Sequence, residues 1–267
     1  MFLTPISCTH SQKGEERNVA AVFNVNQNDP RTYKSGVDGQ IYRSVGKVSC
    51  QDKTNSDRIT ATGSLISSCH LITNHHFWRE CDKERKNIVS FEYDHNGSSF
   101  QKRTLISLSS KGTSREEKTK ESMNDPDWAI YKMSSCAEKD LPKFDVCNEL
   151  SKKELEEKKI ELAGLSFDRV DDKGISVDSG CSVFVSDSGN FLNYGHDCAS
   201  RSKTSGAPLY YLAGDRACLV GIHSSCHTNS SEDRCDTGIV SKFYDENTFN
   251  WAIPAKFFNS AIKALNQ

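Results

Sequence analysis

Long hydrophobic runs are absent from this sequence. No apolar stretch approaches the roughly 18 to 20 residues that a membrane-spanning helix needs, so we expect no membrane span. The first ten residues, Met1 to His10, also lack the apolar stretch of a signal peptide. We expect that a signal peptide was either removed or never present.

The sequence also lacks an excess of charge of either sign. It has 34 Lys and Arg against 36 Asp and Glu, a formal net charge of −2. Without a large basic field the chain cannot hold a phosphate backbone, which excludes nucleic acid as the expected partner. The 267 residues, 36% hydrophobic and 26% charged, suit one double-lobed domain or two domains with a buried core.

Cysteine, by contrast, is abundant, with 11 residues. This density favours an oxidising compartment, and we expect the protein to be secreted or periplasmic. The odd count leaves at least one thiol unpaired or paired outside the chain. Our candidate is Cys8, which lies in a polar N-terminal arm.

Short β-type runs occupy most of the chain after this arm, which covers residues 1–40 and has one strand-like stretch at Val19 to Val25. The first series, in residues 41–147, indicates a small barrel or sandwich. Its runs are Tyr42–Val48, Ile59–Ile66, His70–Thr73, Ile88–Tyr93, Arg103–Leu108 and Trp128–Met133. A second series in residues 148–267 implies a second β half. Its runs are Ile160–Leu165, Gly180–Val185, Phe191–Tyr194, Leu209–Leu212, Cys218–His223 and Thr237–Ser241.

Two segments of the second half have helical patterns. Ser151 to Leu162 carries helix formers with opposed charges at helical spacing, and it predicts a linker between the two β halves. In Pro254 to Leu265, Phe258 and Ile262 fall with Leu265 on one helical face. We therefore expect a C-terminal helix.

Three short segments carry candidate chemistry, and each lies where a loop meets a β-type run. Two adjacent imidazoles, His75 and His76, follow the run that ends at Thr73. A carboxylate, Asp127, directly precedes the run that begins at Trp128. The third segment, TSGAPL, places Ser205 on a turn whose next residue is a glycine. Together they supply a hydroxyl, an imidazole to take its proton and a carboxylate to fix the tautomer, as acyl transfer requires.

With these segments in view, the sequence resembles the trypsin-like (chymotrypsin-fold) serine protease superfamily, nearest its glutamyl endopeptidase branch. The resemblance rests on TNHHF, DWAIYKM and SGAPLYY, supported in order by YRSVGKV, ATGSLIS, HDC and LVGIHSS, and it spans roughly Ile41 to Leu265. It implies an all-β fold of two six-stranded antiparallel β-barrels with a C-terminal α-helix and no cofactor or metal. The first barrel would carry His76 and Asp127, and the second Ser205.

The resemblance assigns roles residue by residue. His76 matches the general base and Asp127 its orienting carboxylate, whereas His75 and Asp125 are neighbours. Ser205 would be the nucleophile of an endopeptidase acting on protein or peptide substrates through an acyl-enzyme. The backbone N–H groups of Ser205 and Lys203 would form the oxyanion hole.

Two positions depart from the family's pattern. Lys203 stands where the family usually has glycine, and its side chain opposes the backbone conformation that aims the N–H at an oxyanion. Thr204 replaces the Asp that receives the new N-terminal amine in trypsin-type zymogens, so activation by that ion pair is excluded.

Substrate-binding residues are also implied by the resemblance. His223 and Ser200 match positions that bind a substrate carboxylate in glutamyl endopeptidases, which implies cleavage after Glu. The alternative is that His223 only packs in a strand beside the cleft. Ser224 matches the serine that supports the catalytic Asp and whose backbone pairs with substrate.

Disulfides are implied less directly. Cys69 with Cys81 resembles a family disulfide around the His76 loop, and Cys181 with Cys198 precedes the serine turn. Cys136 with Cys147 makes a local pair, while Cys218, Cys226 and Cys235 compete for one partner.

Two alternatives to an active protease remain. One is a catalytically impaired relative that binds proteins through the old cleft. The other is a zinc-binding protein, because two regions are rich in Cys and His. These regions contain Cys69, His70, His75, His76 and Cys81, and His223, Cys226, His227 and Cys235.

Overall fold

The structure is a computed structural model, and it describes thirteen stretches of the chain. These are residues 22–23, 31–34, 40–51, 58–83, 88–93, 102–112, 126–147, 149–165, 175–186, 193–200, 203–228, 242–243 and 248–265. No helix in these stretches is long and apolar enough to cross a bilayer.

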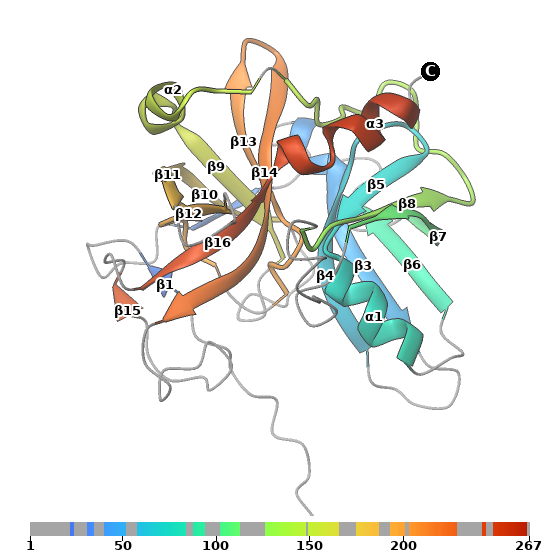
Figure 1. Cartoon of the computed structure of the whole chain (residues 1–267). Helices are drawn as coiled ribbons and strands as arrows, with labels where there is room; N and C mark the ends of the chain where they lie inside the picture. The colour runs from blue at the N-terminus through green and yellow to red at the C-terminus, as the bar shows by residue number, and fades with distance from the viewer. Residues whose placement is uncertain are drawn as a thin grey trace, which may run out of the picture.

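Six antiparallel strands close into a barrel in the N-terminal half of the chain, in the hydrogen-bonded order β3-β4-β5-β8-β7-β6 (Figure 1). The strands are β3 (Val45–Gln51), β4 (Arg58–Leu65), β5 (His70–Thr73), β6 (Ile88–Tyr93), β7 (Lys102–Lys111) and β8 (Ala129–Met133). Closure turns alternate side chains into the barrel. Val48, Leu71, Phe91 and Tyr131 are fully buried in its core.

The C-terminal half forms an eight-stranded antiparallel sheet in the order β11-β12-β16-β14-β13-β9-β10-β2. Its strands are β2 (Thr32–Lys34), β9 (Ile160–Gly164), β10 (Ile175–Cys181), β11 (Val183–Ser186), β12 (Asn193–His196), β13 (Pro208–Ala213), β14 (Arg216–Thr228) and β16 (Thr248–Pro254). A parallel pair, β1 (Val22–Phe23) and β15 (Lys242–Phe243), lies beside it.

The predicted all-β, two-half fold with a C-terminal helix is confirmed, with more strands in the second half than expected. A single residue, Ser182, separates β10 from β11, which divides one expected strand into two. In addition, β2 comes from the N-terminal arm and pairs with β10. The arm therefore contributes a strand to the distant half of the molecule.

Helices are few and short, as expected of this fold. The structure has α1 (His75–Lys83), α2 (Lys152–Glu157), α3 (Asn259–Leu265) and the 3-10 turns η1 (Gln40–Ser44) and η3 (Ala255–Phe257). Helix α2 begins at a capping box, in which Ser151 and Glu154 bond each other's backbone N–H groups. It ends at Glu157, and β9 begins at Ile160, where a β-type run was predicted.

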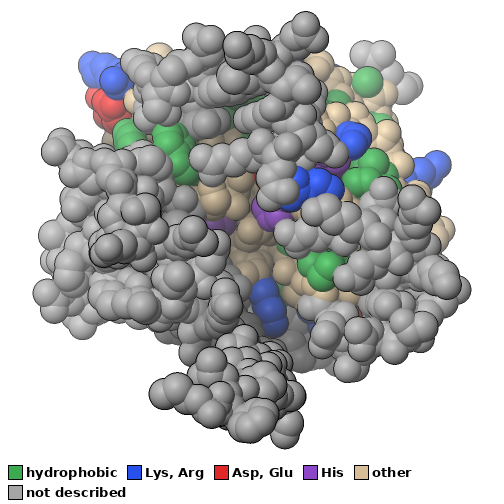
Figure 2. Space-filling view, turned by 60° about the horizontal axis from the view of Figure 1, so that its bottom comes forward, with side chains coloured by type: hydrophobic (Ala, Val, Ile, Leu, Met, Phe, Trp, Pro, Cys, Tyr) green, Lys and Arg blue, Asp and Glu red, His purple; other side chains and the backbone are tan. Residues whose placement is uncertain are grey.

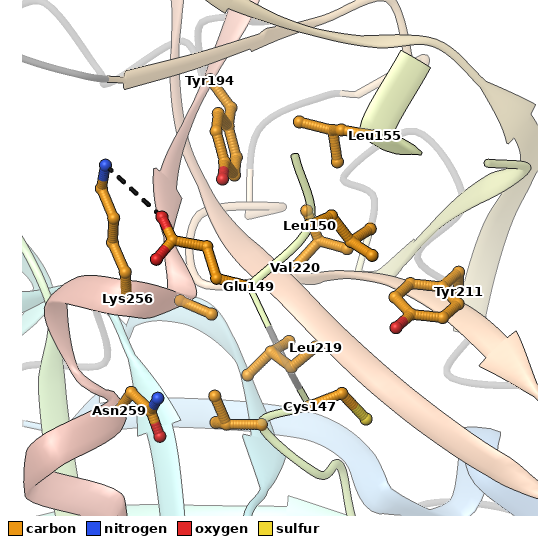
Figure 3. A pocket seen from close by; sticks show the side chains of 12 residues that line it. Cys147, Glu149, Leu150, Leu155, Tyr194, Tyr211, Leu219, Val220, Lys256 and Asn259 are labelled. Atoms are coloured by element: carbon orange, nitrogen blue, oxygen red, sulfur yellow. Dashed lines mark ion pairs between the residues drawn. The ribbon is translucent and has the colours of Figure 1, made fainter. Parts of the chain in front are cut away.

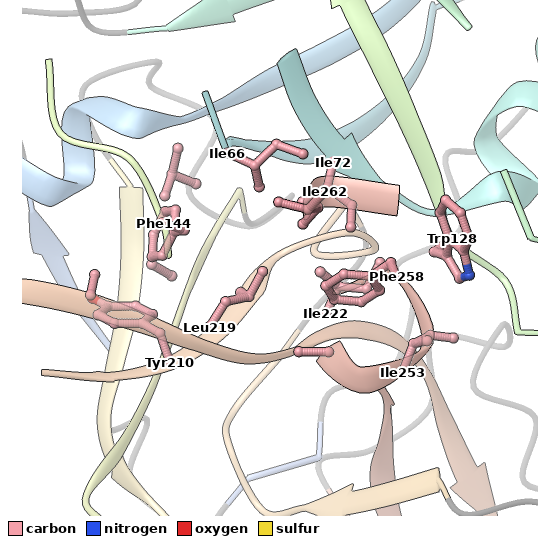
Figure 4. Packing of buried hydrophobic residues seen from close by; sticks show 14 of the residues in the cluster. Ile66, Ile72, Trp128, Phe144, Tyr210, Leu219, Ile222, Ile253, Phe258 and Ile262 are labelled. Atoms are coloured by element: carbon pink, nitrogen blue, oxygen red, sulfur yellow. The ribbon is translucent and has the colours of Figure 1, made fainter. Parts of the chain in front are cut away.

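The buried apolar side chains in the described stretches form three clusters. One fills the N-terminal barrel and another the C-terminal sheet. The third lies between the halves, where Ile72 of the barrel meets Ile222 of β14 and Ile262 of α3 (Figure 4). This shared cluster fixes one half against the other, because burying its apolar side chains favours the packed arrangement.

Four disulfides join described residues, and two of the three expected pairings are wrong. Cys181–Cys198 is confirmed. Cys69 bonds Cys136, and Cys81 bonds Cys50 of β3, in place of Cys69–Cys81. Cys147 bonds Cys218 in place of Cys136. Four disulfides are consistent with an extracytoplasmic location. Cys8 and Cys235 lie outside the described residues, as does the predicted strand Thr237–Ser241.

Candidate active site

The first part of the site is the junction of β5 and α1. Strand β5 ends at Thr73, and His76 is the second residue of α1, with 26% of its side chain exposed. The neighbouring His75 is fully buried, and its Nε2 lies 3.0 Å from the Lys111 Nζ. Because an ammonium group can only donate, His75 Nε2 accepts this hydrogen bond. Of these two neighbouring imidazoles, His76 is therefore the accessible one.

Asp127 holds His76 by two hydrogen bonds. Its Oδ2 lies 2.6 Å from His76 Nδ1, and its Oδ1 accepts the His76 backbone N–H at 2.7 Å. The Asn74 side-chain amide donates to the Asp127 carbonyl oxygen at 3.1 Å. Both the main chain and the ring of His76 are thus fixed against a buried carboxylate, which sets the proton on Nδ1 and leaves Nε2 as the acceptor.

The serine turn lies between β12 and β13, and both halves of the molecule hold it. On the C-terminal side, Gly206 donates its N–H to the His223 carbonyl at 2.8 Å. On the barrel side, the Thr62 N–H donates to the Ser205 carbonyl at 2.9 Å. The Ser205 hydroxyl donates to the Ser224 carbonyl at 3.4 Å. The turn is therefore docked where the two halves meet.

Gly206 is required at this contact for two reasons. Its φ is +84°, and a Cβ there would lie 2.2 Å from both the Thr62 carbonyl oxygen and the Thr73 Oγ1. Any side chain would push the serine turn away from β4 and β5. The turn and the strand that leads to His76 are thus in direct contact.

Lys203 adopts the backbone conformation that its side chain opposes. Its φ is 74°, in the left-handed region, and it is the only non-glycine residue with a positive φ among the described residues. Such a conformation typically costs about 1 to 2 kcal/mol outside glycine. Lysine thus occupies a backbone region that favours glycine, the residue that the family usually has at this position.

Ser200 and His223, the expected carboxylate-binding residues, are 5% and 4% exposed, and each contacts another buried polar side chain. His223 Nδ1 lies 3.1 Å from His196 Nε2. The Ser200 hydroxyl donates to Asn250 Oδ1 at 3.1 Å. Burial, followed by the charge of His76, lowers the pKa of His223 to about 3, so this ring is neutral at neutral pH.

Sequence reasoning missed three residues of this site: Thr62, His196 and Asn250. Thr62 and His196 lie in the blocks ATGSLIS and HDC, but nothing in those blocks marked them individually. Asn250 lies in β16, which was not predicted as a strand. The signal available for β16 was the run Trp251 to Ile253 after a polar stretch.

The described residues do not form a metal site. No group of three or more His, Cys, Asp or Glu side chains among them comes together in a way that would hold a metal ion. Cys69 and Cys81, two of the proposed zinc ligands, are in separate disulfides and have no thiolate to offer. A zinc site built on His76 and these cysteines is thus excluded.

Figure 2 shows the face of the molecule at the bottom of Figure 1, and histidine side chains lie in a hollow near its centre. A separate pocket of about 190 Å³ is formed by the linker, β14 and the C-terminal helix (Figure 3). Leu150, Leu219 and Val220 line it, and Lys256 lies 3.8 Å from Glu149 at its rim. None of the expected site residues lines this pocket.

The sequence matches no protein-family model and has no significant similarity to a curated protein. Solved structures resemble it. A Glu endopeptidase in complex with MPD is 17% identical with a TM-score of 0.60, over 89% of this chain and 98% of that one. The MamO protease domain from Magnetospirillum magneticum is 14% identical with a TM-score of 0.51, over 84% of this chain and 97% of that one.

The serine endoprotease from Yersinia pestis is 14% identical with a TM-score of 0.52, over 85% of this chain. This chain spans only 64% of the length of the Yersinia protein. At such low identities the likeness concerns the fold. The chain has the fold of the trypsin-like serine proteases.

Proposed function

We propose that this protein is a serine endopeptidase with Ser205 as nucleophile, His76 as general base and Asp127 as the carboxylate that orients it. The observation that carries the proposal is the double hydrogen bond between Asp127 and His76. A serine nucleophile needs a neighbouring imidazole that is fixed in one tautomer, with Nε2 free to accept a proton. A buried carboxylate that bonds both the ring and the backbone of one histidine meets that need.

In the proposed reaction, the Ser205 hydroxyl turns from the Ser224 carbonyl toward His76 Nε2 and attacks the carbonyl carbon of a peptide bond. His76 takes the hydroxyl proton, and Asp127 stabilises the imidazolium. The tetrahedral intermediate then collapses, and His76 returns the proton to the leaving amine. Water repeats the sequence on the acyl-enzyme and releases the acid product with Ser205 restored.

The oxyanion would be bound by the backbone N–H groups of Ser205 and Lys203. The positive φ of Lys203 supports this role, because glycine adopts this backbone region freely and the family usually has glycine at this position. Each such donor typically contributes about 3 kcal/mol to transition-state stabilisation. The side chain at position 203 is thus compatible with the hole.

A substitution of Ser205 tests the proposal. We expect S205A to keep the parent's fold and to lose casein hydrolysis by at least about 10³-fold, because no hydroxyl remains to form the acyl-enzyme. S179A, which changes an exposed serine of β10, should keep full activity. A fluorophosphonate probe should label the parent at Ser205. A folded parent that neither reacts with the probe nor cleaves casein would favour the impaired, protein-binding relative instead.

We further propose that the enzyme prefers Glu before the scissile bond, with His223 and Ser200 binding the carboxylate and Ser224 pairing with the substrate backbone. The His196–His223 contact is compatible with this in one of its two tautomers. If His196 Nε2–H donates to His223 Nδ1, the proton of the neutral His223 ring lies on Nε2, where it can donate to a carboxylate. Binding of an anion would also draw His223 toward its protonated form.

Peptides that differ only in this residue test the preference. We expect a Glu peptide to have a kcat/KM at least about tenfold above its Gln and Leu counterparts. H223L should lose this difference and cleave the Leu peptide as well as the parent does. Equal kcat/KM for Glu and Leu peptides in the parent would reject the preference while leaving the protease proposal intact.

The remaining features of the proposal concern the setting of the enzyme. Its partners would be protein or peptide substrates, and its location secreted or periplasmic, in keeping with four disulfides. We propose that the chain divides into an N-terminal arm of residues 1–40, an N-terminal barrel of residues 41–147 and a C-terminal part of residues 148–267. This division follows from the family resemblance, as the expected fold does. Reducing conditions should destabilise such an enzyme, because disulfides occur in both of its halves.

A further inference from the structure

Thr62 is a fully buried residue of β4 that engages the serine turn and its surroundings through every polar group it has. Its N–H donates to the Ser205 carbonyl at 2.9 Å, and its hydroxyl donates to the Lys203 carbonyl at 2.8 Å. The same hydroxyl accepts the Leu165 N–H at 3.0 Å. Its carbonyl accepts the Thr73 hydroxyl at 2.6 Å. One residue of the barrel thus bonds the serine turn, Leu165 after β9 and the strand that leads to His76.

The Thr62 hydroxyl bonds the carbonyl of Lys203, which is the described non-glycine residue with a positive φ. A side chain at a φ of 74° crowds its own main chain, and an unconstrained lysine would relax to a negative φ. That relaxation rotates the Lys203 N–H relative to its carbonyl. The relaxation also needs a matching rotation at ψ of Lys203. The bond from Thr62 to the Lys203 carbonyl, together with the docked Ser205, resists this rotation.

The surroundings of Lys203 reinforce the constraint. The Thr204 hydroxyl donates to the Leu165 carbonyl at 2.9 Å, and the Ala207 N–H donates to the Thr204 carbonyl at 2.8 Å. Leu165 is therefore bonded to both Thr62 and Thr204. The Thr62 hydroxyl is the member of this network that comes from the other half of the molecule and reaches the strained residue directly.

We propose that Thr62 is a positioning residue that holds Lys203 in the conformation with its N–H aimed at the oxyanion. The inference rests on the proposed protease function and deepens it. Thr62 touches no reacting atom, so its effect passes through Lys203. Because Thr62 belongs to the N-terminal barrel, the oxyanion hole in the C-terminal half is complete only when the two halves are packed together.

A purely structural role for Thr62 predicts a different pattern of effects. A buried threonine that merely satisfies hydrogen bonds would lower stability when changed to valine, whatever residue stands at position 203. A residue that opposes strain should matter much less once the strain is removed. Replacing Lys203 by glycine removes the strain, since glycine adopts a positive φ freely.

A double-mutant cycle therefore tests the proposal. We expect T62V, which keeps the shape and the backbone N–H, to lower kcat about 10- to 100-fold with KM changed by less than about twofold. T62S should keep most of the parent kcat, because the hydroxyl remains. K203G supplies the background without strain, and its own kcat is the reference for the double variant. The double variant T62V/K203G should recover at least about tenfold in kcat over T62V.

The matched control is T104V, which removes another buried threonine hydroxyl. Thr104 is 3% exposed and lies in β7, where its hydroxyl contacts those of Ser134 and Ser135, away from the serine turn. We expect T104V to lower the melting temperature without changing kcat. If T62V behaves like T104V, or if T62V reduces kcat equally in the parent and in the K203G background, the proposal is wrong.

A crystal structure of T62V supplies a readout that does not depend on turnover. We expect its Lys203 to have a negative φ, whereas T62S should keep a φ near that of the parent. This separates the two proposals. A parent without activity would reject the protease function, and a T62V structure with Lys203 unchanged would reject the positioning role.

Discussion

Two buried histidines, His196 and His223, face each other inside the C-terminal sheet with their nearest nitrogens 3.1 Å apart. Burial is the main cause that lowers the pKa of both from the ordinary 6.5. The charge of His223 adds to the effect on the His196 pKa, and the charge of His76 adds to the effect on the His223 pKa. Both rings are thus neutral in the folded protein at neutral pH.

This pair should make the protein less stable in mild acid. Below about pH 6.5 the unfolded histidines bind protons that the folded ones refuse, so the free energy of unfolding falls as pH decreases toward the folded pKa of His223, about 3. Each histidine contributes a slope of up to about 1.4 kcal/mol per pH unit. We expect H196Q to reduce the slope, measured by urea unfolding between pH 7 and pH 4.

His70 is the control for the pH dependence of stability attributed to the buried histidine pair. His70 is partly exposed, and burial with the nearby Lys132 lowers its pKa. Because water still reaches part of its ring, H70Q should change the pH slope less than H196Q does. An H196Q slope equal to that of the parent would show that the pair does not control acid stability.

The sequence predicts those site residues that short blocks identify by residue type. It does not predict residues whose contacts depend on distant strands. His76, Asp127 and Ser205 lie in short blocks whose residue types suffice to suggest acyl transfer. His196 and Asn250 do not, because β12 reaches β14 only through β16, and the sequence did not reveal β16. The special backbone of Lys203 was indicated by the glycine that the family usually has there, but the hydroxyl that holds its carbonyl was hidden, since Thr62 is 141 residues away in the chain.

At the scale of elements, the disulfides show the same limit. Cys181–Cys198 closes a stretch with a sequence separation of 17, and it was predicted correctly. Cys69–Cys136 and Cys147–Cys218 have separations of 67 and 71. Such pairs depend on which strands become neighbours, which nearness in sequence does not indicate. Cys81 of α1 likewise bonds β3 rather than the nearby Cys69, and α1 itself was not predicted.

The Cys181–Cys198 disulfide should stiffen the segment that leads to the serine turn. Cys198 precedes Ala199 and Ser200, and the Ala199 N–H donates to the buried Asp178 at 2.7 Å. A loop of this length predicts a loss of about 3 kcal/mol when the bond is removed. We expect the variant with both Cys181 and Cys198 changed to Ala to melt at a lower temperature and to have a reduced kcat/KM.

The paired Ala variant of Cys69 and Cys136 is the comparison. That bond lies at the end of the N-terminal barrel away from the serine turn, and its removal should lower stability with a smaller change in kcat/KM. The two variants are compared by their loss of kcat/KM for a given fall in melting temperature. If that loss is the same in both, the Cys181–Cys198 disulfide has no specific effect on the serine turn.

On the scale of the whole molecule, the site exists only where two halves meet. The proposed base and carboxylate come from the barrel, while the serine turn comes from the C-terminal sheet. The cluster between them includes Phe258 beside α3, which packs edge-on against Trp128 with ring centroids 6.3 Å apart (Figure 4). Trp128 is the residue after Asp127. Phe258, near the C-terminus, therefore supports the segment that carries Asp127.

Phe258 should consequently couple stability to activity. F258A would leave a cavity between the halves, and truncation of a fully buried phenylalanine typically costs about 3 to 5 kcal/mol. We expect urea unfolding to show a loss of this size, and kcat to fall as Asp127 loses the support of Trp128. F91A, whose ring lies wholly in the N-terminal barrel, should cost similar stability with less effect on kcat under conditions where both variants are folded. If F258A retained the parent kcat, packing of the C-terminal segment would contribute to stability alone.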